Sequence, residues 1–118
     1  MSDFDCIQLD DHAKASVIRF TDEKVMEPSR IEQLGQELLS LAENKSPRNL
    51  VINFDNVSFF SSQAINKLIV LERRMKSLGG QILLSNMRPE VRDLFSYTNL
   101  DSVFEIHEEQ DDAIQSIE

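Results

Sequence analysis

The sequence predicts an α/β domain whose mixed, mostly parallel sheet begins with an antiparallel hairpin and has helices packed around it. Three observations lead to this prediction. After residue 20, short apolar runs alternate with longer segments of helical periodicity, which is typical of right-handed βαβ crossovers. Two strand-like runs separated by turn residues precede them and indicate the hairpin. The length of 118 residues suits one domain, so we expect residues 1–118 to form a single unit.

The hairpin and the first helix are the first predicted elements. Residues 4–9 and 15–20 have strand character, and the polar residues between them suit a turn. Apolar residues then recur every three or four positions over 31–42, which predicts a helix. Ser29 and Glu32 have the spacing of a capping box, so we expect them at the start of this helix.

The middle of the chain predicts two strands around a long helix. Residues 50–54 form a nearly continuous apolar run, as in a strand that is covered on both faces. The helix after it carries an apolar stripe over 64–78, and Gly79 and Gly80 follow at its predicted C-terminus. Residues 81–85 form the next strand.

The last part of the chain predicts a helix, a strand and a helix. Pro89 marks the start of the first of these, with Glu90 in the first turn. A strand at 103–106 and a short amphipathic helix at 111–117 complete the order β-β-α-β-α-β-α-β-α. In such sheets, functional groups tend to lie on loops at the carboxyl ends of the strands.

The charge balance excludes several classes of partner. Asp and Glu outnumber Lys and Arg by 21 to 12, giving a net charge of −9, so we expect neither nucleic acid nor an anionic membrane surface as a partner. Seven acids lie within 101–118, which predicts a solvated surface and leaves open an acidic docking site for a basic partner. There is no signal-peptide pattern and no apolar run of about 20 residues, so we expect a cytoplasmic protein.

Few residues could bind a metal or act as a catalytic base. Cys6 is the only cysteine, and together with His12 and His107 it supplies too few ligands for a structural zinc site. We expect Cys6 to be buried and both histidines to lie in exposed loops. A hydrolase with Ser62 as nucleophile would need one of these histidines, and Gly-x-Ser-x-Gly is absent. We therefore predict no enzyme, no metal and no cofactor.

Two serines, Ser61 and Ser62, stand where the second helix begins. Either could cap the helix, and the free N–H groups of a helix start would also favour a phosphate on either side chain. Phe59 and Phe60 come directly before them. We expect Phe59 to be in the core and Phe60 to be partly exposed at an interface.

Three arginines complete the candidate surface residues. Arg73 and Arg74 lie on the polar side of the second helix, where we expect them to be solvated and to pair with Glu72 or other nearby acids. Arg88 follows the strand at 81–85, at the same end of the sheet as the two serines. It is positioned to contact a phosphate or an acidic partner.

These motifs, in this order and spacing, resemble the STAS domain of anti-sigma factor antagonists. In that family a strand of the type L-V-L-D-L leads through V-x-F-[ML] to D-S-[ST]-G-L. A helix, a Gly-Gly pair, a strand and a helix with P-x-V-x-x-[LI]-F follow. This chain has Leu50 to Asp55, then Val57, Phe59 and Phe60, followed by the Gly-Gly pair at 79–80 and the Pro-to-Phe motif at 89–95. The resemblance covers nearly the whole chain and implies a STAS-like single domain.

The resemblance also implies a function. Such antagonists bind a serine-kinase anti-sigma factor, separate from it when the kinase phosphorylates the first motif serine, and are reset by a serine phosphatase. That serine aligns with Ser62, with Ser61 as a second candidate and Ser58 as a third. A local addition of about −1.5 to −2 charges is enough to eject a partner without refolding. As partner-binding residues we expect Phe60, Ser61, Gln63 and Arg88.

Another function stays open within the same family. Ser61, Gln63 and Ala64 occupy the positions of the family's Asp, Ser/Thr and Gly. STAS domains also serve as adaptors or binding modules in signalling or transport complexes, without a phosphorylation switch. A switch protein must gain a phosphate from a cognate kinase, whereas an adaptor need not. The oligomeric state, monomer or weak dimer, is also open.

Overall fold

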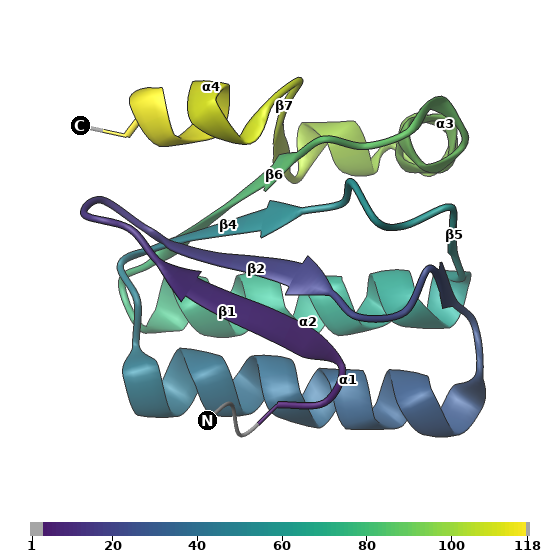
Figure 1. The fold of residues 1–118 in the computed structure, drawn as a ribbon, viewed down its shortest axis with the longest axis horizontal. Coiled ribbons are helices and arrows are strands. Elements are labelled where there is room, and N and C mark those ends of the chain that lie inside the picture. Colours follow the sequence, from purple (N-terminus) through teal and green to yellow (C-terminus); the bar gives the residue numbers. More distant parts are fainter. Residues whose placement is uncertain (1–3, 118) are drawn as a thin grey trace.

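The computed structural model describes residues 4–117, which form a five-stranded sheet with helices on both faces and a separate two-stranded sheet (Figure 1). The order of the larger sheet is β1-β2-β4-β6-β7. Its strands are β1 (Ile7–Asp11), β2 (Ser16–Phe20), β4 (Asn49–Asn53), β6 (Gln81–Ser85) and β7 (Glu105–His107). Only the β1–β2 pair is antiparallel. The predicted mixed sheet and its N-terminal hairpin are confirmed.

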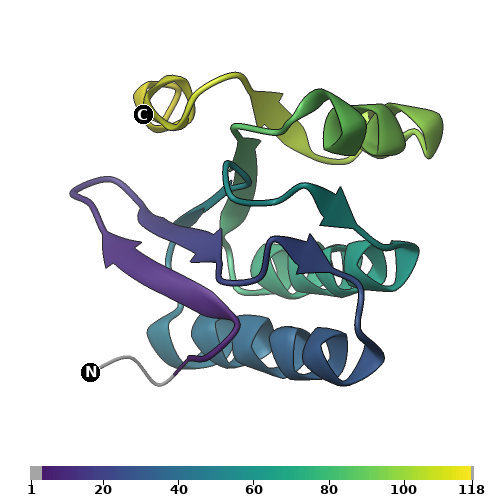
Figure 2. The same cartoon turned by 45° about the vertical axis from the view of Figure 1, so that its right-hand side comes forward.

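The helices cover the two faces of the sheet unequally. The four α-helices are α1 (Pro28–Ser40), α2 (Ser62–Ser77), α3 (Pro89–Tyr97) and α4 (Gln110–Gln115). α1 and α2 lie side by side against one face, and α4 lies on the other side of the sheet (Figures 1 and 2). Both α1 and α2 begin at the end of the molecule where the parallel strands end, on the right of Figure 1. This end therefore collects loops and helix N-termini.

The larger core lies between the sheet and α1, α2 and α3. It contains a chain of phenylalanine rings whose neighbouring centroids are 5.0 to 6.1 Å apart, made of Phe20, Phe54, Phe60, Phe95 and Phe104. Phe54 is fully buried and has three of these rings as neighbours. Because Phe54 directly follows β4, the ring cluster fixes the place where the chain leaves the sheet.

A smaller core lies beneath α4. Val17, Val51 and Leu83 point to this face and pack with Ala113 and Ile117. Their strand neighbours point into the larger core, because successive side chains of a strand face opposite sides. The continuous apolar runs of the sequence therefore reflect strands that are buried on both faces.

Glu37 attaches the N-terminal segment to α1. Its carboxylate is largely buried and accepts hydrogen bonds from the backbone N–H groups of Cys6 (2.9 Å) and Asp5 (3.1 Å) and from the amide of Gln33 (2.9 Å). Burial, followed by the charge of Glu37, raises the pKa of the Cys6 thiol to about 11. Cys6 is therefore a buried, protonated thiol, and its predicted role is confirmed.

Two predictions about the N-terminal third are wrong in detail. The predicted strand over 4–9 is found at Ile7–Asp11, because the N–H groups of Asp5 and Cys6 donate to Glu37 on α1. Ser29 and Glu32 do not form a capping box. Glu27 is the N-cap residue, and the Ser29 hydroxyl donates to its carboxylate. Pro28 begins the helix two positions earlier than a cap at Ser29 would, as its fixed φ angle favours.

The C-terminal elements are also shifted. A short 3-10 turn at Leu100–Ser102 delays the return to the sheet, so the strand predicted over 103–106 lies at Glu105–His107. The helix predicted over 111–117 is found at Gln110–Gln115. At the other end of α2, Gly79 adopts a φ of +82°, which confirms the predicted helix end.

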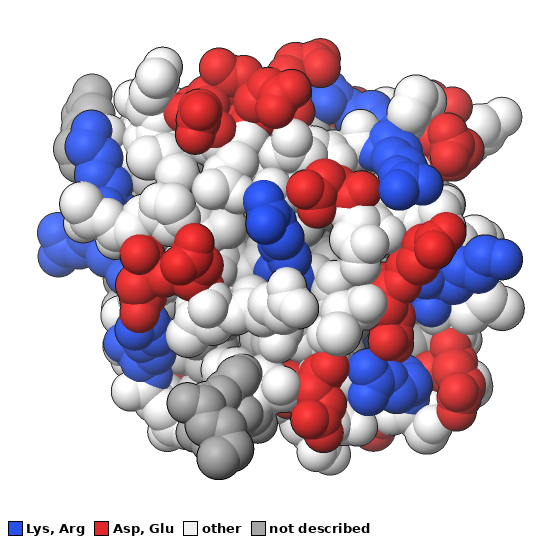
Figure 3. Space-filling view, viewed as in Figure 1, with Lys and Arg blue, Asp and Glu red and all other residues white. Residues whose placement is uncertain are grey.

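Acidic side chains gather over α4 (Figure 3). The exposed members include Glu108, Glu109, Asp111 and Asp112. This is the solvated surface predicted for the C-terminal segment. None of the helices within residues 4–117 has the length and hydropathy of a membrane-spanning segment. In the same part of the chain, no three His, Cys, Asp or Glu side chains are grouped so as to hold a metal ion.

Candidate functional site

The connection from β4 to α2 lies at the carboxyl end of the sheet and is held by an amide. Asn53, the last residue of β4, is only 2% exposed. Its Oδ1 accepts a hydrogen bond from the backbone N–H of Asp55 at 2.8 Å, and its Nδ2 donates to Gln110 Oε1 at 2.9 Å. The backbone N–H of Val57 then donates to the carbonyl of Phe54 at 2.9 Å. These bonds fix the start of the connection.

A two-stranded parallel sheet then carries the chain to α2. It pairs β3 (Lys24–Val25) with β5 (Phe59–Phe60). Just after β5, the backbone N–H of Ser61 donates to the carbonyl of Val25 at 3.0 Å. The sequence does not predict this sheet, because two-residue strands are too short to show a period. Its pairing fixes the backbone directly before α2.

Ser61 is the N-cap residue of α2. Its backbone is extended, and its Oγ accepts a hydrogen bond from the N–H of Ala64 at 3.2 Å. One of the unpaired N–H groups at the helix start is satisfied in this way. The cap role predicted for one of the two serines therefore falls on Ser61.

Ser62 is the first helical residue of α2, and its side chain is exposed. Its hydroxyl forms no hydrogen bond with any of residues 4–117. The partial positive charge of the helix start favours a phosphate at this position. A phosphate on Ser62 would leave the hydrogen bond from Ala64 to Ser61 intact, whereas a phosphate on Ser61 would involve the capping oxygen itself.

Two other candidates lie on either side of this pair. Ser58 is half-buried, and its hydroxyl donates to Glu23 Oε1 at 3.3 Å, so it is less available than Ser62. Gln63 is exposed on the first turn of α2 and lines a groove of about 230 Å³ that α2 forms with α1. Both residues therefore lie in the same segment as the serine pair.

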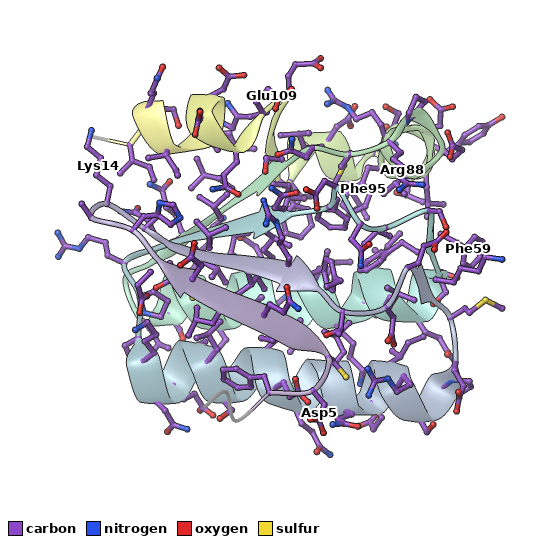
Figure 4. The ribbon with its side chains drawn as sticks, in the orientation of Figure 1. Asp5, Lys14, Phe59, Arg88, Phe95 and Glu109 are labelled. Carbon is purple, nitrogen blue, oxygen red and sulfur yellow. The ribbon has the colours of Figure 1, made fainter. Side chains whose placement is uncertain are left out.

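Arg88 is exposed at the N-cap position of α3. Its guanidinium donates to the carbonyl oxygen of Asp55 at 3.3 Å, which ties it to the β4–α2 connection. Figure 4 shows Arg88 and Phe59 at the same end of the molecule, opposite Lys14. Arg88 forms no hydrogen bond with Ser61 or Ser62, so the structure brings it to the same end but not into contact with the serines.

The two phenylalanines have the reverse of their predicted roles. Phe60 is 1% exposed, and its ring lies 5.3 Å from the rings of both Phe20 and Phe54, so it cannot be a partner-binding residue. Phe59 is 48% exposed. Pairing with β3 turns Phe60 inward, and the strand alternation then turns Phe59 outward. Met26, which follows β3, is 53% exposed and was not a predicted site residue.

Substituting each ring by alanine tests this reversal. Phe60→Ala is expected to lower the free energy of unfolding by about 3–5 kcal/mol, because it removes a fully packed ring. Phe59→Ala is expected to cost about 1 kcal/mol or less, since half of its ring is already in water. Urea denaturation measures both values. Equal losses would contradict the assignment of Phe59 to the surface.

Alanine substitution also separates the two serines. Ser61→Ala is expected to lower the free energy of unfolding by about 1 kcal/mol, because the N–H of Ala64 loses its capping oxygen. Ser62→Ala is expected to change it by less than about 0.5 kcal/mol, as for an exposed residue without a partner. Thermal denaturation of both variants checks the order. A larger loss for Ser62→Ala would show that Ser62 is the structural residue.

Neither histidine is placed to activate Ser62. The Nε2 of His12 lies 3.1 Å from Asp10 Oδ2 in the exposed hairpin turn, as predicted. His107 is half-buried within β7, with its Nε2 2.6 Å from Glu105 Oε2, so its predicted loop position is wrong. Neither residue forms a hydrogen bond with Ser62. The described residues thus do not pair this serine with a histidine base.

The chain belongs to the STAS domain family, whose model matches residues 9–113. Among curated relatives it is similar to BtrV of Bordetella bronchiseptica, a candidate anti-sigma factor antagonist by name. The two are 23% identical over 82 residues, which cover 70% of each chain. The recognition of a STAS-like single domain from sequence motifs is therefore confirmed.

Solved structures show the same fold. An anti-sigma-factor antagonist (STAS) domain protein from Planctomyces limnophilus superposes with a TM-score of 0.82 at 23% identity, covering 93% of this chain and 95% of its own. The phosphorylated form of the Bacillus cell fate determinant SpoIIAA superposes with a TM-score of 0.69 at 21% identity, covering 93% of this chain and 97% of its own. At these identities the likeness concerns the fold.

Proposed function

We propose that this STAS domain, taken over residues 1–118, is an anti-sigma factor antagonist that a serine kinase controls through Ser62. The observation that carries the proposal is the state of the two serines at the start of α2. Ser61 uses its oxygen to cap the helix, while Ser62 presents an exposed hydroxyl without a hydrogen bond to residues 4–117. A similar fold, SpoIIAA, has been solved in a phosphorylated form, which supports the proposal.

In the unmodified state, the exposed side chains around Ser62 bind the kinase. Phe59 and Met26 supply apolar area, and Gln63 and Arg88 supply polar contacts at the same end of the molecule. Exposed apolar side chains of this size commonly anchor interfaces. The complex keeps the kinase, an anti-sigma factor, away from its sigma factor.

In the modified state, a phosphate on Ser62 ends the interaction. It adds about −1.5 to −2 charges at a surface that must lose its water to bind the partner. The fold tolerates the phosphate, because the start of α2 favours an anion. Dissociation therefore needs only a local change of charge, and a serine phosphatase restores the binding state. The nucleotide belongs to the kinase, so this cytoplasmic antagonist needs no cofactor of its own.

Phosphorylation in an extract of the native cells tests the proposal. The wild-type protein, Ser61→Ala and Ser62→Ala are each incubated with the extract and radiolabelled ATP. We expect label on wild type and on Ser61→Ala, and none on Ser62→Ala. Label that persists on Ser62→Ala would reject Ser62 as the acceptor.

A constitutive adaptor is the second candidate function. It is favoured by Ser61, Gln63 and Ala64, which depart from the Asp, Ser/Thr and Gly of the switch motif. Ala64 is fully buried under the cap, so it has a structural reason to be small and apolar. An adaptor would bind its partner equally well with or without a negative charge at Ser62.

A further inference from the structure

The outer surface of α1 and α2 forms a groove that extends away from Ser62. The two helices lie side by side and run in the same direction (Figures 1 and 2). The groove has two hollows. The near one, beside Ser62, is the 230 Å³ hollow lined by Pro28, Ile31, Glu32, Gln63, Asn66 and Lys67. The far one, of about 440 Å³, is lined by Leu39, Glu43, Val70, Arg73, Arg74 and Ser77.

Lys67 lines the near hollow and packs across α1 on the side toward the far one. Its side chain packs directly over Gly35, where a Cβ atom would lie 2.7 Å from the Cδ of Lys67. Its ammonium reaches Glu32 at 3.0 Å. On α2 the lining residues recur every three or four positions, so both hollows lie along one face of this helix. From Gln63 to Ser77 this face is about 21 Å long at 1.5 Å per residue.

The floor of the far hollow is apolar and reaches solvent. Val70 is 46% exposed although it lies in the middle of a helix, and Leu39 on α1 is half-buried opposite it. No residue within 4–117 covers Val70 further. An apolar floor between two parallel helices is the form of surface that receives an amphipathic helix.

The rim of the far hollow is basic, although the chain carries a net charge of −9. Arg74 pairs with a nearby acid as predicted, namely Glu43 at 2.8 Å, while Glu72 lies 3.4 Å from Lys76. Arg73 is exposed and has no hydrogen bond or ion pair with any residue in 4–117. The predicted pairing of both arginines is therefore wrong for Arg73, and its guanidinium is available to an acidic partner.

We propose that this groove binds an acidic amphipathic helix of the kinase, as a second contact beside the one at Ser62. The inference rests on the proposed function for the identity of the partner. The apolar side of the incoming helix covers Val70 and Leu39, and its carboxylates meet Arg73. A length of about 21 Å accommodates roughly four helical turns. The second contact gives the partner specificity that the short segment at Ser62 does not supply alone.

Site-specific crosslinking tests where the partner lies. Val70→Cys is labelled with a benzophenone maleimide, and Val103→Cys is the matched control, since the two valines are 46% and 47% exposed. Cys6 stays in place because its thiol is buried and protonated. Each labelled protein is irradiated with the kinase that phosphorylates Ser62. We expect a crosslink from position 70 to an acidic helix of the kinase, and none from position 103.

Reversing the charge at Arg73 tests the groove proposal independently of the crosslink. Arg73→Glu is expected to weaken kinase binding about tenfold at low salt, with a smaller effect at high salt, since an interfacial arginine is replaced by a like charge. Arg92→Glu, an exposed arginine on α3, is the control and is expected to change binding less than about twofold. Arg74 is left unchanged because its substitution would also break its ion pair with Glu43.

The outcomes separate this inference from the proposed function. If the kinase binds wild type, and neither the label at position 70 nor Arg73→Glu differs from its control, the groove proposal is wrong while the switch at Ser62 stands. A crosslink to a segment that is not acidic would also reject it. If no kinase binds the unmodified protein, the proposed function fails, and this inference fails with it.

Discussion

Replacing Ser62 by aspartate is expected to weaken binding of the anti-sigma factor kinase by about 100-fold or more. The carboxylate places a permanent charge where the proposed interface must lose its water. An uncompensated charge buried in an interface costs on the order of 2–5 kcal/mol, and each 1.4 kcal/mol is a factor of about ten in affinity. Isothermal titration of the kinase with each variant measures the loss.

Two further variants make this result specific for charge. Ser62→Asn matches aspartate in shape without its charge, and Ser62→Ala removes the hydroxyl. Both are expected to keep binding within about threefold. Unfolding does not explain a loss with Ser62→Asp, because an acid in the first turn stabilises a helix by about 0.3–1 kcal/mol. If the aspartate and asparagine variants bind equally, charge at Ser62 does not control the partner.

Replacing Phe54 by alanine is expected to lower the free energy of unfolding by about 3–5 kcal/mol. Phe54 is fully buried, with the ring centroids of Phe20, Phe60 and Phe95 5.0 to 6.1 Å from its own. The structure does not close on the cavity, because these neighbours belong to different elements. Since domains of this size are stable by about 5–15 kcal/mol, the variant loses a large share of its stability.

Urea denaturation with Tyr97→Ala as control checks this value. Tyr97 is 90% exposed, so its loss is expected to change stability by less than about 0.5 kcal/mol. Phe54→Ala is also expected to increase hydrogen exchange at the N–H of Ser61, which donates to Val25, before that of the middle of α2, because Phe54 holds the connection that leads to it. A loss below about 1 kcal/mol would contradict the packed ring cluster.

The order of elements was predictable because long elements repeat their apolar period several times. The stripe on α2 repeats the helical period, and the continuous apolar runs indicate strands buried on both faces. The structure places α2 and β6 as predicted and β4 one residue earlier, at Asn49–Asn53. Short elements do not repeat a period. β3 and β5 have two residues each, so they were found only in the structure.

Because the β3–β5 sheet was not predicted, the orientations of the two phenylalanines were predicted wrongly. Phe59 and Phe60 are chemically identical, and only the pairing of β5 with β3 decides which one points inward. The same pairing exposes Met26. By contrast, the serine pair could be located from sequence, since Ser is common at helix starts. Which serine caps the helix depends on one hydrogen bond, from Ala64 to Ser61.

The arginines on α2 show a similar limit. Periodicity places Arg73 and Arg74 on the polar side of the helix, and the structure agrees that both are exposed. The partner of Arg74 depends on the neighbouring helix, because Glu43 lies on the π-helical turn after α1. No local spacing in the sequence indicates a contact between residues that are 31 positions apart.

Phosphopeptide mass spectrometry on the protein from its native cells tests the central claim most directly. The tryptic peptide from Asn49 to Lys67 contains Ser58, Ser61 and Ser62 and no other hydroxyl side chain. We predict a phosphate on Ser62, with a stoichiometry that changes between growth and stress. A peptide that stays unmodified under every condition, or that carries its phosphate only on Ser58 or Ser61, would contradict the switch at Ser62.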